Sequence, residues 1–529
     1  MRITTKIIQN NSLSNINTNK LLQDSLNTQM ASGKKINRPS DDPVIAIRAL
    51  RLRSTLTEVT QYCDKNVEDA DSWLGVTEDA IETVIEAIED MYEQCNRGSN
   101  KDLTSENREI ILESLKGLRD EIYATGDADY AGRGLFTGYR TGTKLRFQED
   151  TQQTYSITEK VNKAVLDDIT YVKMDNGKNA IGEINNGNYT DSDYQMTDTA
   201  ISRETVHRLR LSYDGLEEGF TPEITYYNGD SRLNNSLQTI TVETVSIYDT
   251  DGNGNLIDPY QKAKEAAHEN EEYAVFIPET GELILNDKAY EALSATRDYA
   301  ATDDVDESTI SITYKKSEWD KGDLRPEHYF ECVEDPDGRN IHHNSEDEEA
   351  NDQIISYDVG FNQEIRVNTL ASECYTHAIG RDLDDLISVL EQVSDTEKSV
   401  IGLKAIIEDT SVSADDKAIA EKSLAAAEKA LTFLNEKLQK SFEKGITKMQ
   451  GHLNVATLAM TDVGTRDKKL ELVKTRLSSQ KSNFKDLVAD NEQVNTAEVA
   501  TDLASAKLAY DAALMATGKI ADSTLMNYI

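Results

Sequence analysis

Apolar residues recur with a heptad rhythm towards both ends of this 529-residue chain, while a different pattern fills the middle. The N-terminal rhythm alternates spacings of four and three residues, and a second apolar row at sevens flanks it. A repeat of 3.5 residues sustained over such a length specifies a coiled coil. The main stripe consists of Leu52, Leu56, Val59, Cys63, Asn66, Ala70, Trp73, Thr77, Ala80, Val84, Ala87 and Met91.

The C-terminal part carries the matching rhythm, in residues 442–463 and again in residues 470–494. Two heptad segments that flank a different domain have to bury their apolar stripes against each other. We therefore predict a mainly α fold with an inserted β-rich domain, in which both chain ends form one long antiparallel coiled-coil rod.

Helix start and stop signals divide each half of this rod. The first helix is predicted over residues 5–32, because Gly33 follows it as a left-handed stop. Asp42 and Pro43 supply a capping oxygen and a first-turn proline, so the second helix starts there. Asn495, with Glu498 three residues later, marks another helix start, and the last helix is out of phase with the one before it.

These breaks predict three parts of the chain. Residues 1–42 and 495–529 form terminal helices, residues 43–142 and 360–494 form the helical rod, and residues 143–359 form the inserted domain. The inserted domain alternates apolar and polar side chains in segments such as 238–248 and 308–314, which are rich in β-branched and aromatic residues. That alternation predicts antiparallel strands.

Turn residues punctuate the inserted domain. Asn228-Gly229 and Asp337-Gly338 are pairs that favour tight hairpin turns. One short helix is predicted over about residues 258–270, and the acidic residues 345–352 are predicted to form a solvated loop.

Net charge limits the partners that the chain can have. The formal charge is −40, from 56 basic and 96 acidic side chains, and phosphate binding needs clustered Lys and Arg, so neither nucleic acid nor an anionic membrane is expected as a partner. The polar N-terminus lacks a secretory signal pattern, and no apolar run reaches the ~20 residues of a membrane helix. We expect a cytoplasmic protein or one exported through a different signal.

The four cysteines form neither a disulfide ladder nor a zinc pattern. Cys63 and Cys95 fall on the apolar helical stripes, where small buried hydrophobic residues are expected. For Cys332 and Cys374 a disulfide bridge stays open.

One loop places oxygen-bearing side chains at alternate positions with a glycine at position six, as a calcium loop does. Its candidate ligands are Asp249, Asp251, Asn253 and Asn255. Position twelve is Tyr260 instead of an acid, so the bidentate ligand is missing and a tight hairpin turn is favoured.

No pattern of catalytic residues stands out, and no cofactor is expected. The only zinc-peptidase candidate, His268-Glu269, lacks the second histidine four residues after the first. We therefore expect a protein that is not an enzyme.

Three segments resemble the flagellin family. Residues 32–37, Ser-Gly-Lys-Lys-Ile-Asn, followed by Asp41-Asp42-Pro43, are similar to the family's approach to its second helix. Residues 463–471 resemble a segment of the family's C-terminal rod helix, and residues 525–529 resemble its apolar C-terminal end. The chain is identified by these motifs as a member of that family.

Two further segments separate the members of the family. Residues 132–138, Gly-Arg-Gly-Leu-Phe-Thr-Gly, and residues 358–368 resemble the members that join the flagellar hook to the filament more than they resemble filament flagellins. A filament flagellin subunit is the alternative, and an adhesin or a hydrolase carried on the inserted domain is a weaker one.

The resemblance implies an extracellular structural subunit of the bacterial flagellum, exported by the flagellar type III apparatus. The terminal helices would form an inner layer that orders on assembly, and the variable inserted domain would face outward. Implied partners are further copies in a ring or tube layer, hook-associated protein 1, flagellin and an export chaperone. The expected assembly residues are Ile3, Ile7, Leu13, Ile16, Leu503, Tyr510, Leu514 and Leu525.

Overall fold

The computed structural model describes residues 5–100, 103–227, 237–295, 310–335, 339–344 and 353–522. The chain forms two compact units. The first contains Met1–Ser72, Ser356–Ile365 and Arg466–Ile529, and the second contains Trp73–Ile355 and Arg366–Thr465. Each unit thus combines segments from both halves of the chain, which is the pairing that the two heptad regions predict. Among the described helices, none combines the length and apolar character needed to cross a membrane.

The first unit begins with two helices whose ends follow the predicted signals. Helix α1 spans Thr5–Ser32 and stops at Gly33, whose φ is +68° and whose N–H donates to the Gln29 carbonyl at 2.8 Å. Helix α2 spans Pro43–Gln61, and the Asp42 carboxylate accepts the N–H groups of Val44 and Ile45 at 2.9 and 3.1 Å. Both predicted boundaries are confirmed.

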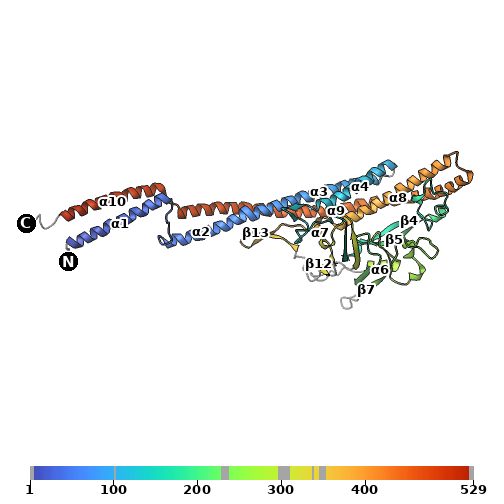
Figure 1. Ribbon diagram of the computed structural model, residues 1–529, viewed down its shortest axis with the longest axis horizontal. Coiled ribbons are helices and arrows are strands. Elements are labelled where there is room, and N and C mark those ends of the chain that lie inside the picture. The colour runs from blue at the N-terminus through green and yellow to red at the C-terminus, as the bar shows by residue number, and fades with distance from the viewer. Residues whose placement is uncertain are drawn as a thin grey trace, which may run out of the picture. The chain divides into compact units, whose positions relative to one another are not determined.

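The last helix of the first unit, α10, spans Thr496–Asp522 and begins at the predicted cap, where the Asn495 side chain accepts the Ala497 N–H. Figure 1 shows α1 and α10 running alongside each other with the two chain ends at the same end of the pair. Leu26, near the end of α1, packs against Val499 and Ala506, near the start of α10. The two helices are therefore antiparallel.

Long helices carry the heptad stripes. Helix α3 spans Val67–Gly98, and helix α9 spans Ala414–Glu492. The stripe residues of α3 are buried, from Val67 and Ala70 through Trp73 to Met91 and Cys95. In the second unit a Cβ on Gly98 would meet the Phe442 ring, and one on Gly445 would meet the Cys95 sulfur, so residue numbers rise on α3 as they fall on α9. The predicted antiparallel coiled coil is confirmed.

One turn of π-helix, η1 at Tyr62–Asn66, separates α2 from α3. The heptad pattern, which runs through Asn66, predicted an uninterrupted helix here. Instead the Asn66 side-chain amide donates to the Asp358 carbonyl at 2.7 Å, in strand β13 at Ser356–Gly360. Strand β13 pairs with β14 at Gln363–Arg366. The extra residue of the π turn thus accompanies an anchored hairpin, as such turns often mark specific contacts.

The second unit contains a ten-stranded sheet in the order β12-β11-β3-β10-β6-β7-β8-β9-β5-β4. Its strands are β3 Thr151–Val161, β4 Leu166–Lys173, β5 Ser202–Arg210, β6 Glu223–Tyr227, β7 Leu237–Thr244, β8 Tyr273–Ile277, β9 Glu282–Leu285, β10 Ile310–Trp319, β11 Glu331–Glu334 and β12 Ile341–His343. The pairs are antiparallel except β7 with β8, which is parallel. The prediction of antiparallel strands is therefore confirmed for the sheet as a whole and wrong at that pair, because a longer connection over residues 245–272, rather than a tight hairpin turn, joins β7 to β8.

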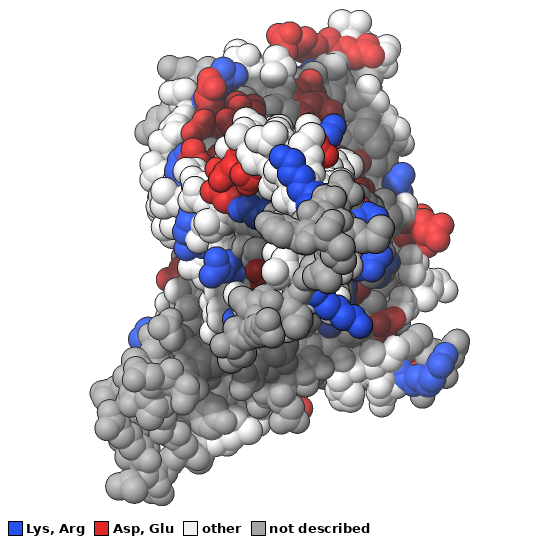
Figure 2. Space-filling view, turned by 90° about the vertical axis from the view of Figure 1, so that its left-hand side faces the viewer, with Lys and Arg blue, Asp and Glu red and all other residues white. Residues whose placement is uncertain are grey.

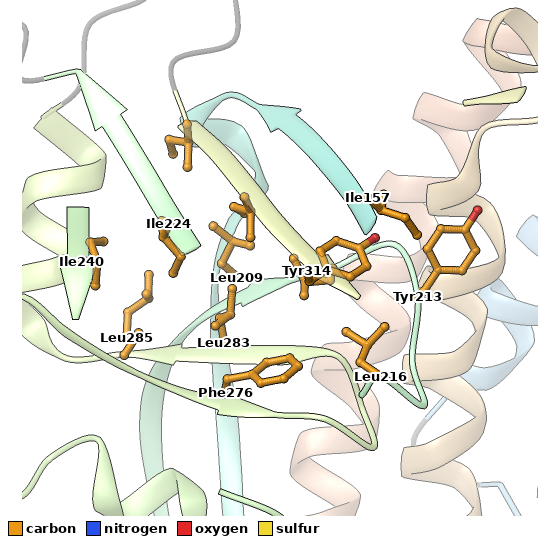
Figure 3. Packing of buried hydrophobic residues seen from close by; sticks show 14 of the residues in the cluster. Ile157, Leu209, Tyr213, Leu216, Ile224, Ile240, Phe276, Leu283, Leu285 and Tyr314 are labelled. Carbon is orange, nitrogen blue, oxygen red and sulfur yellow. The ribbon is translucent and has the colours of Figure 1, made fainter. Parts of the chain in front are cut away.

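The sheet buries one large apolar cluster. Figure 3 shows side chains from several strands pointing toward one another in this cluster, with Tyr213 and Leu216 contributed by the segment after β5. Ile157, Ile224, Phe276, Leu283 and Ile312 are fully buried there. Buried positions alternate along β3 and β10, as expected for strands with one buried face, whereas β8 and β9 are buried at every position.

Further helices belong to the second unit. They are α4 Ser105–Thr125, α5 Pro259–Lys262, α6 Asp287–Ala295, α7 Ala371–Cys374 and α8 His377–Glu408, and a small hairpin of β1 Asp129–Tyr130 and β2 Arg133–Gly134 follows α4. The helix predicted over residues 258–270 is wrong in length: only α5 and one 3-10 turn, Ala266–His268, form there. Asp258 caps α5, and Pro259 occupies its first turn.

Several predictions concern turns and cysteines. The pairs Asn228-Gly229 and Asp337-Gly338 and the acidic residues 345–352 lie outside the described residues.

All four cysteines are buried and free, so the disulfide between Cys332 and Cys374 that the sequence left open does not form. Burial of Cys63 and Cys95 within the helical stripes is confirmed.

Candidate assembly surfaces

The terminal helices α1 and α10 contact each other through a narrow face. On α10 this face is the heptad stripe of the sequence: Val499 and Ala506 are buried, and Leu503, Tyr510, Ala513 and Thr517 are half-buried. The last apolar stripe thus pairs inside one chain.

The matching face of α1 is mostly polar. Ile16 and Leu26 are the buried apolar residues of α1. The other half-buried positions on the same side are Gln9, Ser12, Asn19, Gln23 and Gln29. A helix with amides facing its partner gains little from the hydrophobic effect, so the α1–α10 contact alone is a weak one.

Large apolar side chains instead lie on the outer faces of the pair. On α1 they include the doublets Ile7–Ile8 and Leu21–Leu22, which stand fourteen residues, or two heptads, apart and therefore share a face. Leu21 is 71% exposed. On α10, Leu508 and Met515 are one heptad apart and each 74% exposed. Exposed apolar rows of this kind mark surfaces that bind another protein.

The eight expected assembly residues divide between inner and outer faces. Ile7, Leu13 and Leu514 are exposed, whereas Ile16 is buried and Leu503 and Tyr510 are half-buried in the α1–α10 contact. Ile3 and Leu525 lie outside the described residues. The sequence pattern did not single out Leu21, Leu22, Leu508 or Met515, although adjacent Leu pairs at heptad spacing are a visible signal.

Charge is sparse on this pair of helices. The charged residues of α1 are Lys6, Lys20 and Asp24, and those of α10 are Glu498, Asp502, Lys507, Asp511, Lys519 and Asp522. In a chain with a net charge of −40, copies repel each other wherever acidic surfaces meet. The terminal helices are the part of the chain on which that repulsion is smallest.

The two linkers next to these helices are held together. The Lys35 N–H donates to the Glu492 carbonyl at 2.7 Å, and the Val494 N–H donates to the Gly33 carbonyl at 3.1 Å. The side chains of Arg53 and Glu492 form an ion pair close by. The end of α1 at Gly33 and the start of α10 after Asn495 therefore lie next to each other.

The candidate calcium loop uses its carboxylates inside the turn. Asp251 accepts the N–H groups of Asn253 and Asn255, each at 2.8 Å, and Asp249 accepts the Ser246 N–H at 2.9 Å. The Asn255 side-chain amide donates to Asp251 at 3.1 Å. These contacts account for the Asp/Asn/Gly pattern as turn chemistry. Within the described ranges, no three His, Cys, Asp or Glu side chains gather as metal ligands would.

A buried ion network ties the sheet of the second unit to helix α8. Arg208 on β5 pairs with Glu282 and Asp385 at 2.6 and 2.8 Å, and Arg210 pairs with Asp382 at 2.8 Å. Asp385 has a lowered pKa because, although burial opposes its charge, the nearby cations of Arg210 and Arg208 outweigh that effect. Sequence patterns did not indicate this network, because its members lie on elements far apart in the chain.

On the surface, charges are distributed unevenly. Figure 2 shows, on one face, acidic side chains in groups and basic ones lying singly between them.

The N-terminal part of the chain matches a known protein family. Residues 3–141 match the family of the bacterial flagellin N-terminal helical region. Flagellar hook-associated protein 3 of Salmonella typhimurium is 27% identical over 211 residues, which cover 38% of this chain and 66% of that protein. The protein of the same name from Escherichia coli K12 is 26% identical over 166 residues, which cover 31% of this chain and 52% of that protein.

Solved structures align over more of the chain but with low scores. FlgL of Xanthomonas campestris has a TM-score of 0.26 at 10% identity, covering 82% of this chain and 99% of its own. The flagellar junction protein FlgL of Legionella pneumophila has a TM-score of 0.25 at 9% identity, covering 85% and 100%. Scores of this size carry no weight here, so the assignment depends on the sequence matches. Residues 3–141 thus match the flagellin N-terminal helical region, and the chain is similar to flagellar hook-associated protein 3.

Proposed function

We propose that this chain is a structural subunit of the bacterial flagellum that joins the hook to the filament, as a hook-associated protein 3 does. The observation that carries the proposal is the terminal helix pair within a chain similar to that protein. Its inner contact is weak and polar, its outer faces are apolar, and its charge is low, so the pair gains most from burial between neighbouring copies.

The residues proposed to make these contacts are those on the outer faces. They include Ile7, Leu13 and Leu514, to which the structure adds Leu21, Leu22, Leu508 and Met515. Ile16, Leu503 and Tyr510 would hold α1 against α10 within one copy. The terminal helices would then order fully once neighbours cover their outer faces.

The proposed partners follow from the position between hook and filament. They are further copies in a ring or tube layer, hook-associated protein 1 on the hook side, flagellin on the filament side, and an export chaperone before passage through the type III apparatus. We propose an extracellular location in the flagellum and no catalytic activity.

Deleting the gene and viewing the cells by negative-stain electron microscopy tests this proposal. Hooks without filaments, with unpolymerised flagellin in the medium, are the expected result. Short filaments on an intact junction would favour the alternative, a filament flagellin. Normal flagella would contradict both functions.

A further inference from the structure

Helix α2 presents an apolar and basic face that the described residues of the first unit leave exposed. Val44, Ile47 and Leu50 stand three residues apart and are 69%, 54% and 65% exposed. The opposite side of the helix is buried through Ala46, Ala49 and Val59. Three large apolar side chains in one exposed row form a contact surface, and they lie on a packed helix whose position is fixed.

Two arginines accompany this row. Arg48 and Arg51 are exposed and stand three residues apart, on the same side of α2 as Val44. Within the part of the chain that the structure describes, neither pairs with a carboxylate. The only acidic residue of α2 is Glu58, so the helix is basic in a chain whose net charge is −40. A partner for this face has to be acidic.

A complementary face exists on α3 of the same protein. Glu78, Glu82, Glu86 and Glu89 follow spacings of four, four and three residues, so they form one stripe, and all are exposed. The buried stripe of α3, with Ile81, Val84 and Ile88, lies on the other side of the helix. These four glutamates have no cation partner among the residues placed in the structure.

A glycine continues the acidic stripe. Gly75 stands one heptad before Glu82, is exposed, and has no atom within 4 Å of the position that a Cβ would take. Glycine inside a helix costs ~1 kcal/mol relative to alanine, and no packing among the described residues accounts for this one. A close approach by a large side chain of another copy would account for it.

We propose that the outer face of α2 docks on the acidic stripe of α3 in a second copy of this chain. Arg48 and Arg51 would pair with glutamates of the stripe, and Leu50 would lie over Gly75. The contact joins two different surfaces, so each copy offers one half to each of two neighbours and a ring or a helical layer can grow. The inference rests on the proposed function in that both require self-assembly, and it names the faces that meet.

Charge exchange between purified full-length chains tests the pairing. One variant carries Arg48→Glu and Arg51→Glu, and the other carries Glu82→Arg and Glu86→Arg. Each alone presents like charges across the contact, whereas a mixture of the two restores opposite charges at every contact. We expect each variant to associate about tenfold more weakly than the wild type by sedimentation equilibrium, and the equimolar mixture to associate within about threefold of it.

Glu109→Arg with Glu113→Arg, two exposed acids on α4 at the same spacing, is the matched control and should associate as the wild type does. Wild-type association should also weaken as salt rises from 50 to 500 mM, values chosen to shorten the Debye length from above ~10 Å to below ~5 Å. Variants that associate normally, a mixture that stays dissociated, or a wild type that is monomeric throughout would overturn the proposal. Sedimentation measures only association between copies. It therefore tests this contact even if the gene deletion shows that the chain does not join the hook to the filament.

Discussion

Asp382 is a buried carboxylate that two cationic side chains and a histidine approach. Arg210 and Lys448 each contact it at 2.8 Å, and the His452 Nε2 lies at 2.9 Å. Burial opposes its charge, but the hydrogen bond to His452 and the charges of Lys448 and Arg210 lower its pKa to about 2. A single residue thereby holds the sheet and helices α8 and α9 of the second unit together.

Removing this carboxylate takes the acidic partner from Lys448 and one of two carboxylate partners from the half-buried Arg210, which keeps Asp385. We expect Asp382→Ala to lower the free energy of unfolding by ~3 kcal/mol. Urea denaturation followed by tryptophan fluorescence measures this directly, since Trp73 and Trp319 are both buried in the second unit. The control Asp395→Ala removes an exposed carboxylate that pairs with Lys398 at 3.0 Å, and it should change stability by less than ~1 kcal/mol. Equal effects of the two variants would contradict this account of the network.

The same residue predicts a dependence on acid. Because the folded pKa of Asp382 lies below its unfolded value of ~3.9, its contribution is fully present above that value and is lost as pH falls toward about 2. Wild-type stability should therefore fall over this window more steeply than that of Asp382→Ala. If the urea midpoints of the wild type and of Asp382→Ala fell in parallel as pH is lowered, the ion pairs of Asp382 would not be the cause.

His377 also loses a stabilising contribution in acid, but here the folded state favours the neutral side chain. Its ring packs among Tyr213, Tyr329 and Phe330, and neither ring nitrogen has a partner among the described residues. Burial, aided by the nearby charge of Arg381, lowers its pKa to about 3. A histidine kept neutral when folded stabilises above its unfolded pKa of ~6.5 and loses that contribution as pH falls toward about 3.

We expect His377→Phe to be neutral or stabilising by ~1 kcal/mol at pH 7, because it replaces buried unpaired nitrogens with a ring of similar shape. It should also flatten the pH dependence between 6.5 and 4. Urea midpoints at several pH values test both points, and a large loss of stability at pH 7 would show that the imidazole has a partner.

At the scale of the elements, helix periodicity was the dependable signal. The limits of α1, the cap at Asp42 and the restart at Asn495 follow from local chemistry that a sequence displays directly. The π turn at Asn66 and the parallel pair β7–β8 depend on contacts with distant segments, so no local pattern announced them.

The candidate assembly residues could likewise be predicted only in part from the sequence. An apolar heptad predicts that a residue is buried, but it does not say whether the partner is the same chain or another copy. Leu503 and Tyr510 proved to face α1, while Ile7 and Leu514 face outward. Only the placed helices distinguish these two cases.

Adding charge to an outer face of the terminal pair should block assembly without unfolding the chain. We expect Ile7→Asp, Leu21→Asp and Leu508→Asp each to reduce attached filaments at least about tenfold in a deletion strain that expresses the variant, because an unpaired charge would be buried between copies. The control Asn15→Asp adds the same charge at an exposed polar position of α1 and should retain filaments. Normal filament numbers with the three variants would show that the outer faces of α1 and α10 make no contact that assembly requires.

At the scale of the whole molecule, the terminal faces proposed for assembly and the sheet core lie in different units. The outer apolar faces of α1 and α10 belong to the first unit, and both tryptophans and the sheet belong to the second. A chain lacking residues 1–42 and 495–529 should keep the urea midpoint of its tryptophan fluorescence within about 0.3 M, since those residues add nothing to the second core. It should restore no filaments. A large shift of the midpoint would show that the terminal helices support the second unit.

Immunogold labelling of isolated hook–filament complexes, with antibodies against the sheet domain, tests the proposed role most directly. The account predicts a single band of gold between the hook and the filament. Gold along the whole filament, or none on the flagellum, would contradict it.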